Sequence, residues 1–136
     1  MGPTTLLLVD DHVILLRILS DFLGGEEGIL VVGTAGSAEE ALEKAKELQP
    51  QVILLNLLVM PGLGALSAIP RLRSMMPDVG IIVLTVLDAK AYREAALTAG
   101  ADDFVAEASL YTDLIPAIQR LTQGRRFIGE TSPVPA

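Results

Sequence analysis

Two acids and an amide stand at the ends of apolar segments, where side chains that bind a cation or a phosphate are often found. The apolar run 6–9 leads directly into Asp10 and Asp11, and the apolar run 52–55 ends at Asn56. Carboxylates in such places bind divalent cations, and a further carboxylate beside them could accept a phosphoryl group. Asn56 stands where that carboxylate would be expected. Because an amide is a poor nucleophile and a weaker, uncharged metal ligand, the residues outline a phosphotransfer pocket that lacks its acceptor.

Short apolar runs alternate with amphipathic stretches along the whole chain, which predicts five units of a strand followed by a helix. We expect the strands at residues 5–9, 29–35, 51–56, 79–85 and 103–106. Such units form a parallel sheet with helices on both faces, and ligands bind beyond the carboxyl ends of the strands. The polar residues expected at those ends are Asp10, Asp11, Asn56, Thr85 and Glu107.

Capping residues, glycines and prolines set the expected limits of the helices. Asp11 is expected to cap a helix that stops at Gly24 and Gly25, and Ser37 with Glu40 forms a capping box for a helix to about residue 48. A third helix is expected over 64–74 with Pro70 inside it, and a fourth over 89–99 with Asp88 as its cap. The last is expected over 112–122 and stopped by Gly124, so that Pro116 lies in its first turn. The residues expected in the core are Leu7, Val9, Val32, Ile53, Leu55, Ile82, Leu84 and Val105.

Composition narrows the class of protein. The 136 residues suit one domain, and an apolar share of 51% with 20% charged residues indicates a globular chain. The net charge of −7 disfavours a nucleic-acid surface, and no apolar run is long enough for a membrane helix. The N-terminus lacks the basic region of a signal peptide, so we expect a cytoplasmic protein. An enzyme is not favoured, because neither a glycine-rich phosphate loop after the first strand nor a nucleophile–base pair is evident.

Four stretches in order along the chain carry a family resemblance. They are Val9 to His12, Pro50 to Gly62, Ile82 to Thr85, and Ala99 to Phe104. Over about residues 4–124 the chain resembles a response-regulator receiver domain of the CheY-like superfamily, of the NarL/FixJ type that usually precedes a LuxR-like DNA-binding domain. The resemblance implies a flavodoxin-like three-layer α/β sandwich, with a five-stranded parallel sheet in the order 2-1-3-4-5. Residues 125–136 are expected to be a tail or the start of a linker.

The resemblance assigns roles by position. Asp10 and Asp11 match the acid pair that binds Mg²⁺, and Asn56 occupies the position of the phospho-acceptor aspartate. Thr85 and Phe104 match the switch hydroxyl and the switch aromatic. Glu107 occupies the position of the lysine that pairs with phosphoryl oxygens. A weak Mg²⁺ site of Asp10, Asp11 and Glu107 is therefore expected.

The chain departs from the family at several places in this one pocket. Asn56 replaces the nucleophile, Glu107 reverses a charge, Val86 replaces a small residue, and one residue is inserted between Asn56 and Met60-Pro61. These departures predict a degenerate receiver in two-component signalling. It would have no catalytic residue and would act through contacts with a sensor histidine kinase or another signalling protein. Whether it also forms a homodimer is left open by the sequence. The alternatives are an ordinary phospho-accepting receiver of a LuxR-type regulator, truncated and with its aspartate replaced, and a small flavodoxin-like enzyme.

Overall fold

The computed structural model describes residues 2–59, 64–86 and 90–131, with the backbone alone for residues 124–131. Its strands form one sheet in the order β2-β1-β3-β4-β5, and every neighbouring pair is parallel. This order confirms the predicted α/β fold. The bounds are β1 Thr4–Val9, β2 Ile29–Ala35, β3 Val52–Asn56, β4 Gly80–Thr85 and β5 Asp103–Ala106.

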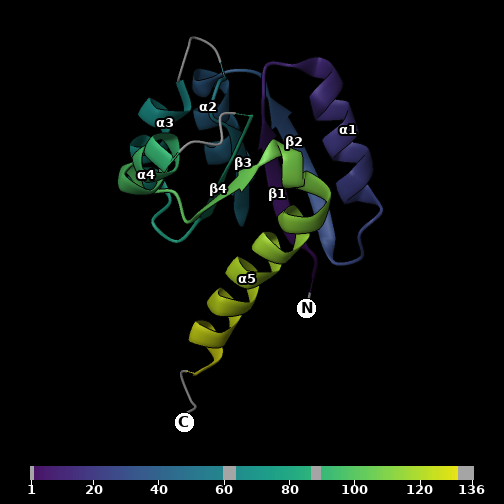
Figure 1. The fold of residues 1–136 in the computed structure, drawn as a ribbon. Coiled ribbons are helices and arrows are strands. Elements are labelled where there is room, and N and C mark those ends of the chain that lie inside the picture. The colour runs from purple at the N-terminus through teal and green to yellow at the C-terminus, as the bar shows by residue number, and fades with distance from the viewer. Residues whose placement is uncertain (1, 60–63, 87–89, 132–136) are drawn as a thin grey trace.

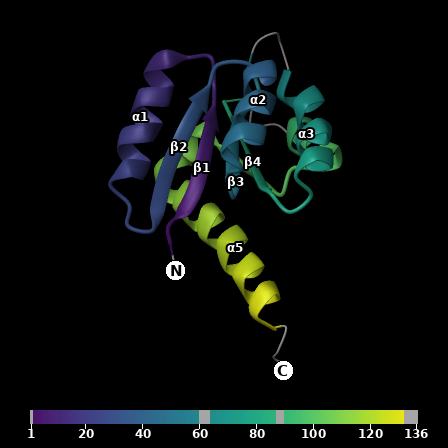
Figure 2. The same cartoon turned by 180° about the vertical axis from the view of Figure 1, so that it is seen from behind.

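Helices cover both faces of this sheet. They are α1 Val13–Gly24, α2 Ala38–Leu48, α3 Gly64–Met75, α4 Lys90–Ala99 and α5 Leu110–Thr131, with a short 3₁₀ helix η1 at Glu107–Ser109. Figures 1 and 2 show α1 and α5 on one face, and α2, α3 and α4 on the other. The three layers agree with the predicted sandwich. In the part of the chain described here, no helix combines the length and apolar character needed to cross a membrane.

The core lies in two layers, one on each side of the sheet. Alternate residues of β1 face opposite ways, so that Leu7 packs toward α2 and α3 while Leu8 packs toward α1 and α5. Ile53 and Leu54 divide in the same way on β3. Burial on both faces is the reason that these strands are continuous apolar runs in the sequence. The predicted core positions that the structure buries are Leu7, Val9, Ile53, Leu55, Ile82, Leu84 and Val105.

Val32 is the exception, and the prediction that it belongs to the core is wrong. It is only half-buried on β2, which is an edge strand with a neighbour on one side. The pairing between β1 and β2 also skips Val32, because Leu6 pairs with Val31 whereas Leu7 pairs with Gly33. Val32 is thus the extra residue of a β-bulge and has no partner on β1.

The starts of the first two helices test the capping predictions. His12, not Asp11, caps α1, and its Nδ1 accepts a hydrogen bond from the backbone N–H of Leu15 at 3.2 Å. At α2 the cap at Ser37 is confirmed, because its Oγ accepts from the N–H of Glu40 at 3.0 Å. The other half of the predicted capping box differs, because the Glu40 carboxylate accepts from the backbone N–H of Gly36, one residue before the cap, at 2.7 Å. The cap predicted at Asp88, and the Met60-Pro61 pair, lie outside the described residues.

The last helix is longer at both ends than the sequence indicated. It begins at Leu110, directly after η1, and continues through Gly124 to Thr131. Pro116 therefore lies in its second turn and not in the first, and Gly124 does not end it. Both residues are compatible with a helix: Pro116 is exposed, so water can satisfy the carbonyl that loses its donor, and an interior glycine costs only about 1 kcal/mol relative to alanine.

Candidate functional site

The pairing register places the polar residues of interest along the edge of the sheet that is formed by the carboxyl ends of its strands. Asn56, the last residue of β3, pairs with Leu84 on β4, and Thr85 pairs with Ala106 on β5. Asp10 follows β1 and Glu107 follows β5. The carboxyl ends of the strands thus carry the predicted residues, as expected for a parallel α/β sheet.

Asp10 is the buried centre of this edge. It is 2% exposed, and both of its carboxylate oxygens accept hydrogen bonds. Oδ1 accepts from the backbone N–H of His12 at 2.9 Å, and Oδ2 accepts from Nδ2 of Asn56 at 2.8 Å. The carboxylate is therefore paired with donors from the start of α1 and from the end of β3.

Asn56 uses both ends of its side-chain amide. Nδ2 donates to Asp10, and Oδ1 accepts from the backbone N–H of Leu58 at 2.8 Å. A backbone N–H can only donate, so this contact fixes which end of the amide is the oxygen. The only oxygen of the side chain thus points to the loop after β3. An amide held in this way cannot attack phosphorus as a carboxylate would.

The other acids at this edge differ in their surroundings. Asp11 is exposed, and Glu107 is half-buried at the first position of η1. Within residues 2–59, 64–86 and 90–131, no three acidic or histidine side chains are grouped so that they could hold a metal ion. The structure therefore does not bring Asp10, Asp11 and Glu107 together as one ready three-carboxylate site. Asp10 and Asp11 remain a possible pair of ligands, because a cation such as Mg²⁺ can keep most of its water.

The two predicted switch residues both lie inside the fold. Thr85 is fully buried at the end of β4, and Phe104 on β5 is 5% exposed. The guanidinium of Arg93, on α4, lies 4.9 Å from the centroid of the Phe104 ring. Val86, next to Thr85, is 58% exposed. Sequence reasoning missed the contact between Arg93 and Phe104, since no motif links these two positions.

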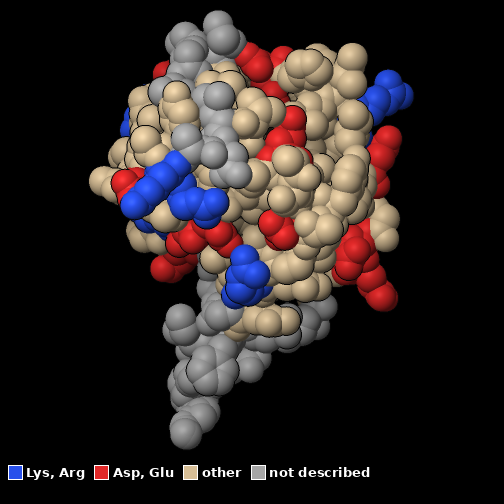
Figure 3. All heavy atoms as spheres, viewed as in Figure 1, with Lys and Arg blue, Asp and Glu red and all other residues tan. Residues whose placement is uncertain are grey.

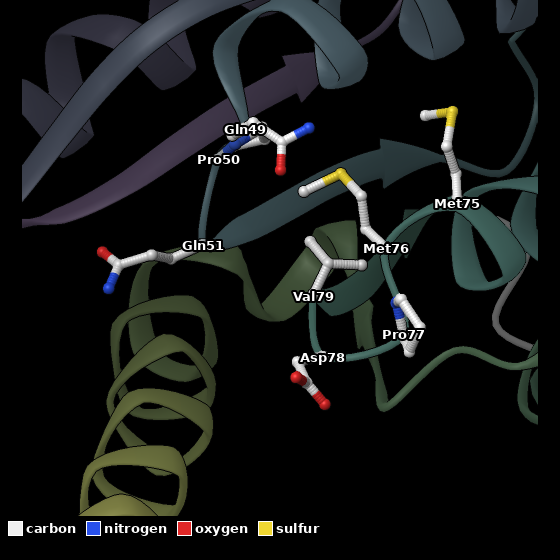
Figure 4. A pocket seen from close by; sticks show the side chains of 8 residues that line it. All are labelled: Gln49, Pro50, Gln51, Met75, Met76, Pro77, Asp78 and Val79. Carbon is white, nitrogen blue, oxygen red and sulfur yellow. The ribbon is translucent and has the colours of Figure 1, made fainter.

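A hollow lies at the opposite edge of the sheet, between the connections α2–β3 and α3–β4 (Figure 4). It has a volume of about 350 Å³, and Figure 4 shows Met76 and Val79 facing Gln49 and Pro50 while Asp78 points away. Gln49 donates to carbonyls of its own helix. The hollow contains no acid–base or nucleophile pair, and it takes no part in the site.

Charge is distributed thinly over the face that carries α5. Figure 3 shows Lys and Arg side chains in small separate groups, with Asp and Glu side chains around and between them. Among the described residues on this face no continuous basic surface is seen, which agrees with the net charge of −7.

Comparison with known proteins decides the family. The profile of the response regulator receiver domain matches residues 6–119. The chain is a response regulator receiver domain. The response regulator GacA of Pseudomonas viridiflava is 34% identical over 122 residues, which is 90% of this chain and 56% of that protein. The chain therefore spans little more than half the length of such relatives.

Solved structures agree with this assignment. A LuxR-family two-component response regulator from Aurantimonas sp. SI85-9A1 superposes with a TM-score of 0.85 at 28% identity, over 90% of this chain and 87% of that one. A response regulator from Burkholderia pseudomallei, solved with a phosphorylated aspartic acid, a calcium ion and citrate, gives a TM-score of 0.77 at 25% identity, over 96% and 75% of the two chains. The family resemblance seen in the sequence is thereby confirmed.

Proposed function

We propose that this receiver works through protein contacts and does not run an aspartyl-phosphate cycle. The observation that carries the proposal is Asn56 at the acceptor position, with its Nδ2 on Asp10 and its Oδ1 on the backbone of Leu58. Its side chain has no carboxylate to accept a phosphoryl group. The Burkholderia regulator carries a phosphorylated aspartic acid, and this chain has no equivalent group at residue 56.

The charges around the position support the same proposal. Asp10, Asp11 and Glu107 are acids, and the position of the family lysine is taken by Glu107. A phosphoryl group gains its stabilisation from cations and hydrogen-bond donors, so carboxylates at these points oppose it. The proposed receiver is a cytoplasmic, non-enzymatic unit of residues 4–124. Its partner is a sensor histidine kinase or another signalling protein, or a second copy, and the unit itself does not bind DNA.

We also propose a weak divalent-ion site at the acid pair. Asp10 and Asp11 would hold the ion, with Glu107 contributing its charge at a greater distance. The calcium ion of the Burkholderia structure supports an ion in this family. The protein supplies few ligands here, and Asp10 already accepts two hydrogen bonds. We therefore expect low affinity.

Intact-mass spectrometry after incubation with acetyl phosphate and Mg²⁺ tests the main proposal. The unmodified protein is expected to keep its mass, because no carboxylate is present at residue 56. A labile gain of one phosphoryl group would overturn the proposal. The measurement is direct and does not require the partner to be known.

The same measurement on Asn56→Asp separates the proposal from its nearest alternative. If the chain is an ordinary receiver that lost only its acceptor, this one change should restore phosphorylation. We expect little restoration, because Glu107 and Val86 remain unsuited to an incoming phosphodonor. The double variant Asn56→Asp with Glu107→Lys is the matched comparison, and it should be phosphorylated more than the single one.

A further inference from the structure

The side chain of Asn56 joins three separate segments of the chain. Its Nδ2 reaches Asp10 after β1, and its Oδ1 reaches the backbone of Leu58 in the loop after β3. Asp10 in turn accepts from the backbone N–H of His12, which caps α1. One amide and one carboxylate therefore tie the end of β1, the end of β3, the next loop and the start of α1 together.

A buried carboxylate such as Asp10 must be compensated. At 2% exposure its charge is largely removed from water, and this is costly unless donors or a cation face it. Two N–H donors face it here, one on each oxygen. Among the described residues, no buried side-chain nitrogen or oxygen lacks a hydrogen-bond partner. The hydrogen-bonding needs of the Asp10 carboxylate are thus met by groups of the protein itself.

We propose that the amide of Asn56 is a built-in substitute for a divalent cation, which holds this edge of the sheet assembled when no ion is bound. The inference goes beyond the proposed function, because it concerns the resting structure and does not depend on whether the domain is ever phosphorylated. It has a direct consequence for ion binding. An ion that approaches Oδ2 of Asp10 on the lone pair that faces Asn56 must displace the amide, so the two compete for that lone pair.

The first test is Asn56→Asp, followed by thermal unfolding with and without Mg²⁺. The new carboxylate can still accept from Leu58, but it cannot donate to Asp10 and places a second negative charge beside it. Without Mg²⁺ the variant is expected to melt several degrees below the unmodified protein. Saturating Mg²⁺ should recover most of that loss and shift the variant more than it shifts the unmodified protein.

The matched control exchanges the two groups. In the double variant Asp10→Asn with Asn56→Asp, the amide at position 10 donates to the carboxylate at position 56, and its oxygen still accepts from the N–H of His12. Its melting temperature without Mg²⁺ should return close to that of the unmodified protein. The single change Asp10→Asn should melt below the unmodified protein, because the NH₂ groups of the amides at positions 10 and 56 then face each other and neither can accept.

The outcomes separate clearly. The inference is overturned if Asn56→Asp melts with the unmodified protein in the absence of Mg²⁺, or if the exchanged pair is no more stable than the sum of its two single changes predicts. If Asn56→Asp does not fold even with Mg²⁺, folding of the exchanged pair supports the inference and its failure to fold refutes it. None of these results depends on phosphorylation, so failure here is distinguishable from failure of the proposed function.

Discussion

Asp11 and Glu107 are the other two acids at the strand ends near which Asp10 is buried, and they have different parts in the proposed ion site. Asp11 is exposed and adjacent in sequence, so a hydrated ion can reach it, whereas Glu107 is not grouped with the two aspartates as a ready ligand set. We expect Mg²⁺ to raise the melting temperature of the unmodified protein slightly. When the Mg²⁺ concentration equals the dissociation constant, so that half of the sites are occupied, binding adds only about 0.4 kcal/mol to the free energy of unfolding.

Asp11→Asn should abolish this Mg²⁺-induced shift, and Glu107→Lys should reduce it without abolishing it. Asp21→Asn is the control, because Asp21 is an exposed aspartate on α1 outside the site. Melting must be compared with and without Mg²⁺ for each protein, since Glu107→Lys also relieves repulsion between acids. Complete loss of the shift in Glu107→Lys would instead make Glu107 a direct ligand, as the sequence first indicated.

For single residues, the sequence predicts where in the fold a side chain lies better than it predicts which groups that side chain contacts. The apolar runs that end at Asp10, Asn56 and Thr85 were enough to place these residues at one edge of a sheet. They could not show which way the Asn56 amide turns, because that depends on the N–H of Leu58 in the following loop. Nor could they show that Arg93 lies over Phe104, since this contact arises only when α4 packs beside β5.

At the scale of elements, Arg73 holds together two connections, α3–β4 and α4–β5, at the edge of the sheet opposite the candidate site. From the end of α3 its guanidinium donates to the carbonyls of Pro77, Val79 and Gly100 and to the carboxylate of Asp102. The same carboxylate accepts from the backbone N–H of Ile81, at 2.8 Å. One side chain thereby links α3, the start of β4 and the turn before β5.

Arg73→Ala should lower the free energy of unfolding by about 2–4 kcal/mol, because it leaves several partly buried acceptors without their charged donor. Urea unfolding measures this loss. Arg73→Lys keeps the charge but not the planar fork, so its loss should be intermediate. Arg71→Ala is the matched control: Arg71 meets Glu39 at 3.4 Å on the exposed surface, and its removal should change stability by less than about 1 kcal/mol. Equal losses in Arg73→Ala and Arg71→Ala would contradict the proposed link.

The sequence predicted the strands to within about a residue, because burial on both faces makes them unbroken apolar runs. The wrong predictions are those in which the type of a single residue was used to decide burial or the limit of a helix. Val32 has the right type for a core strand, but the bulge on an edge strand leaves it half-buried. Gly124 and Pro116 are unfavourable inside a helix, yet α5 continues through both of them.

For the whole molecule, the question is how much of α5 the receiver needs. Its fully buried residues on the described part of the helix are Leu114, Ala117 and Ile118, and Thr122 contacts Thr4 through their hydroxyl oxygens at 3.2 Å. Beyond these turns, Figures 1 and 2 show α5 running past the lower edge of the sheet. We therefore propose that the stable unit ends near Gly124, although the helix itself does not.

A chain shortened to residues 1–124 should unfold in urea with a free energy within about 1 kcal/mol of the full chain, because it keeps every contact just described. A chain shortened to residues 1–115 is the control. It loses Ala117 and Ile118 from the layer between α5 and the sheet, so it should lose at least about 3 kcal/mol or fail to fold. The slope of the free energy against urea reports the surface exposed on unfolding, and it should be nearly unchanged in the longer form. If the 1–124 chain lost as much stability as the 1–115 chain, the end of α5 would belong to the folded unit, and the limit at Gly124 would be wrong.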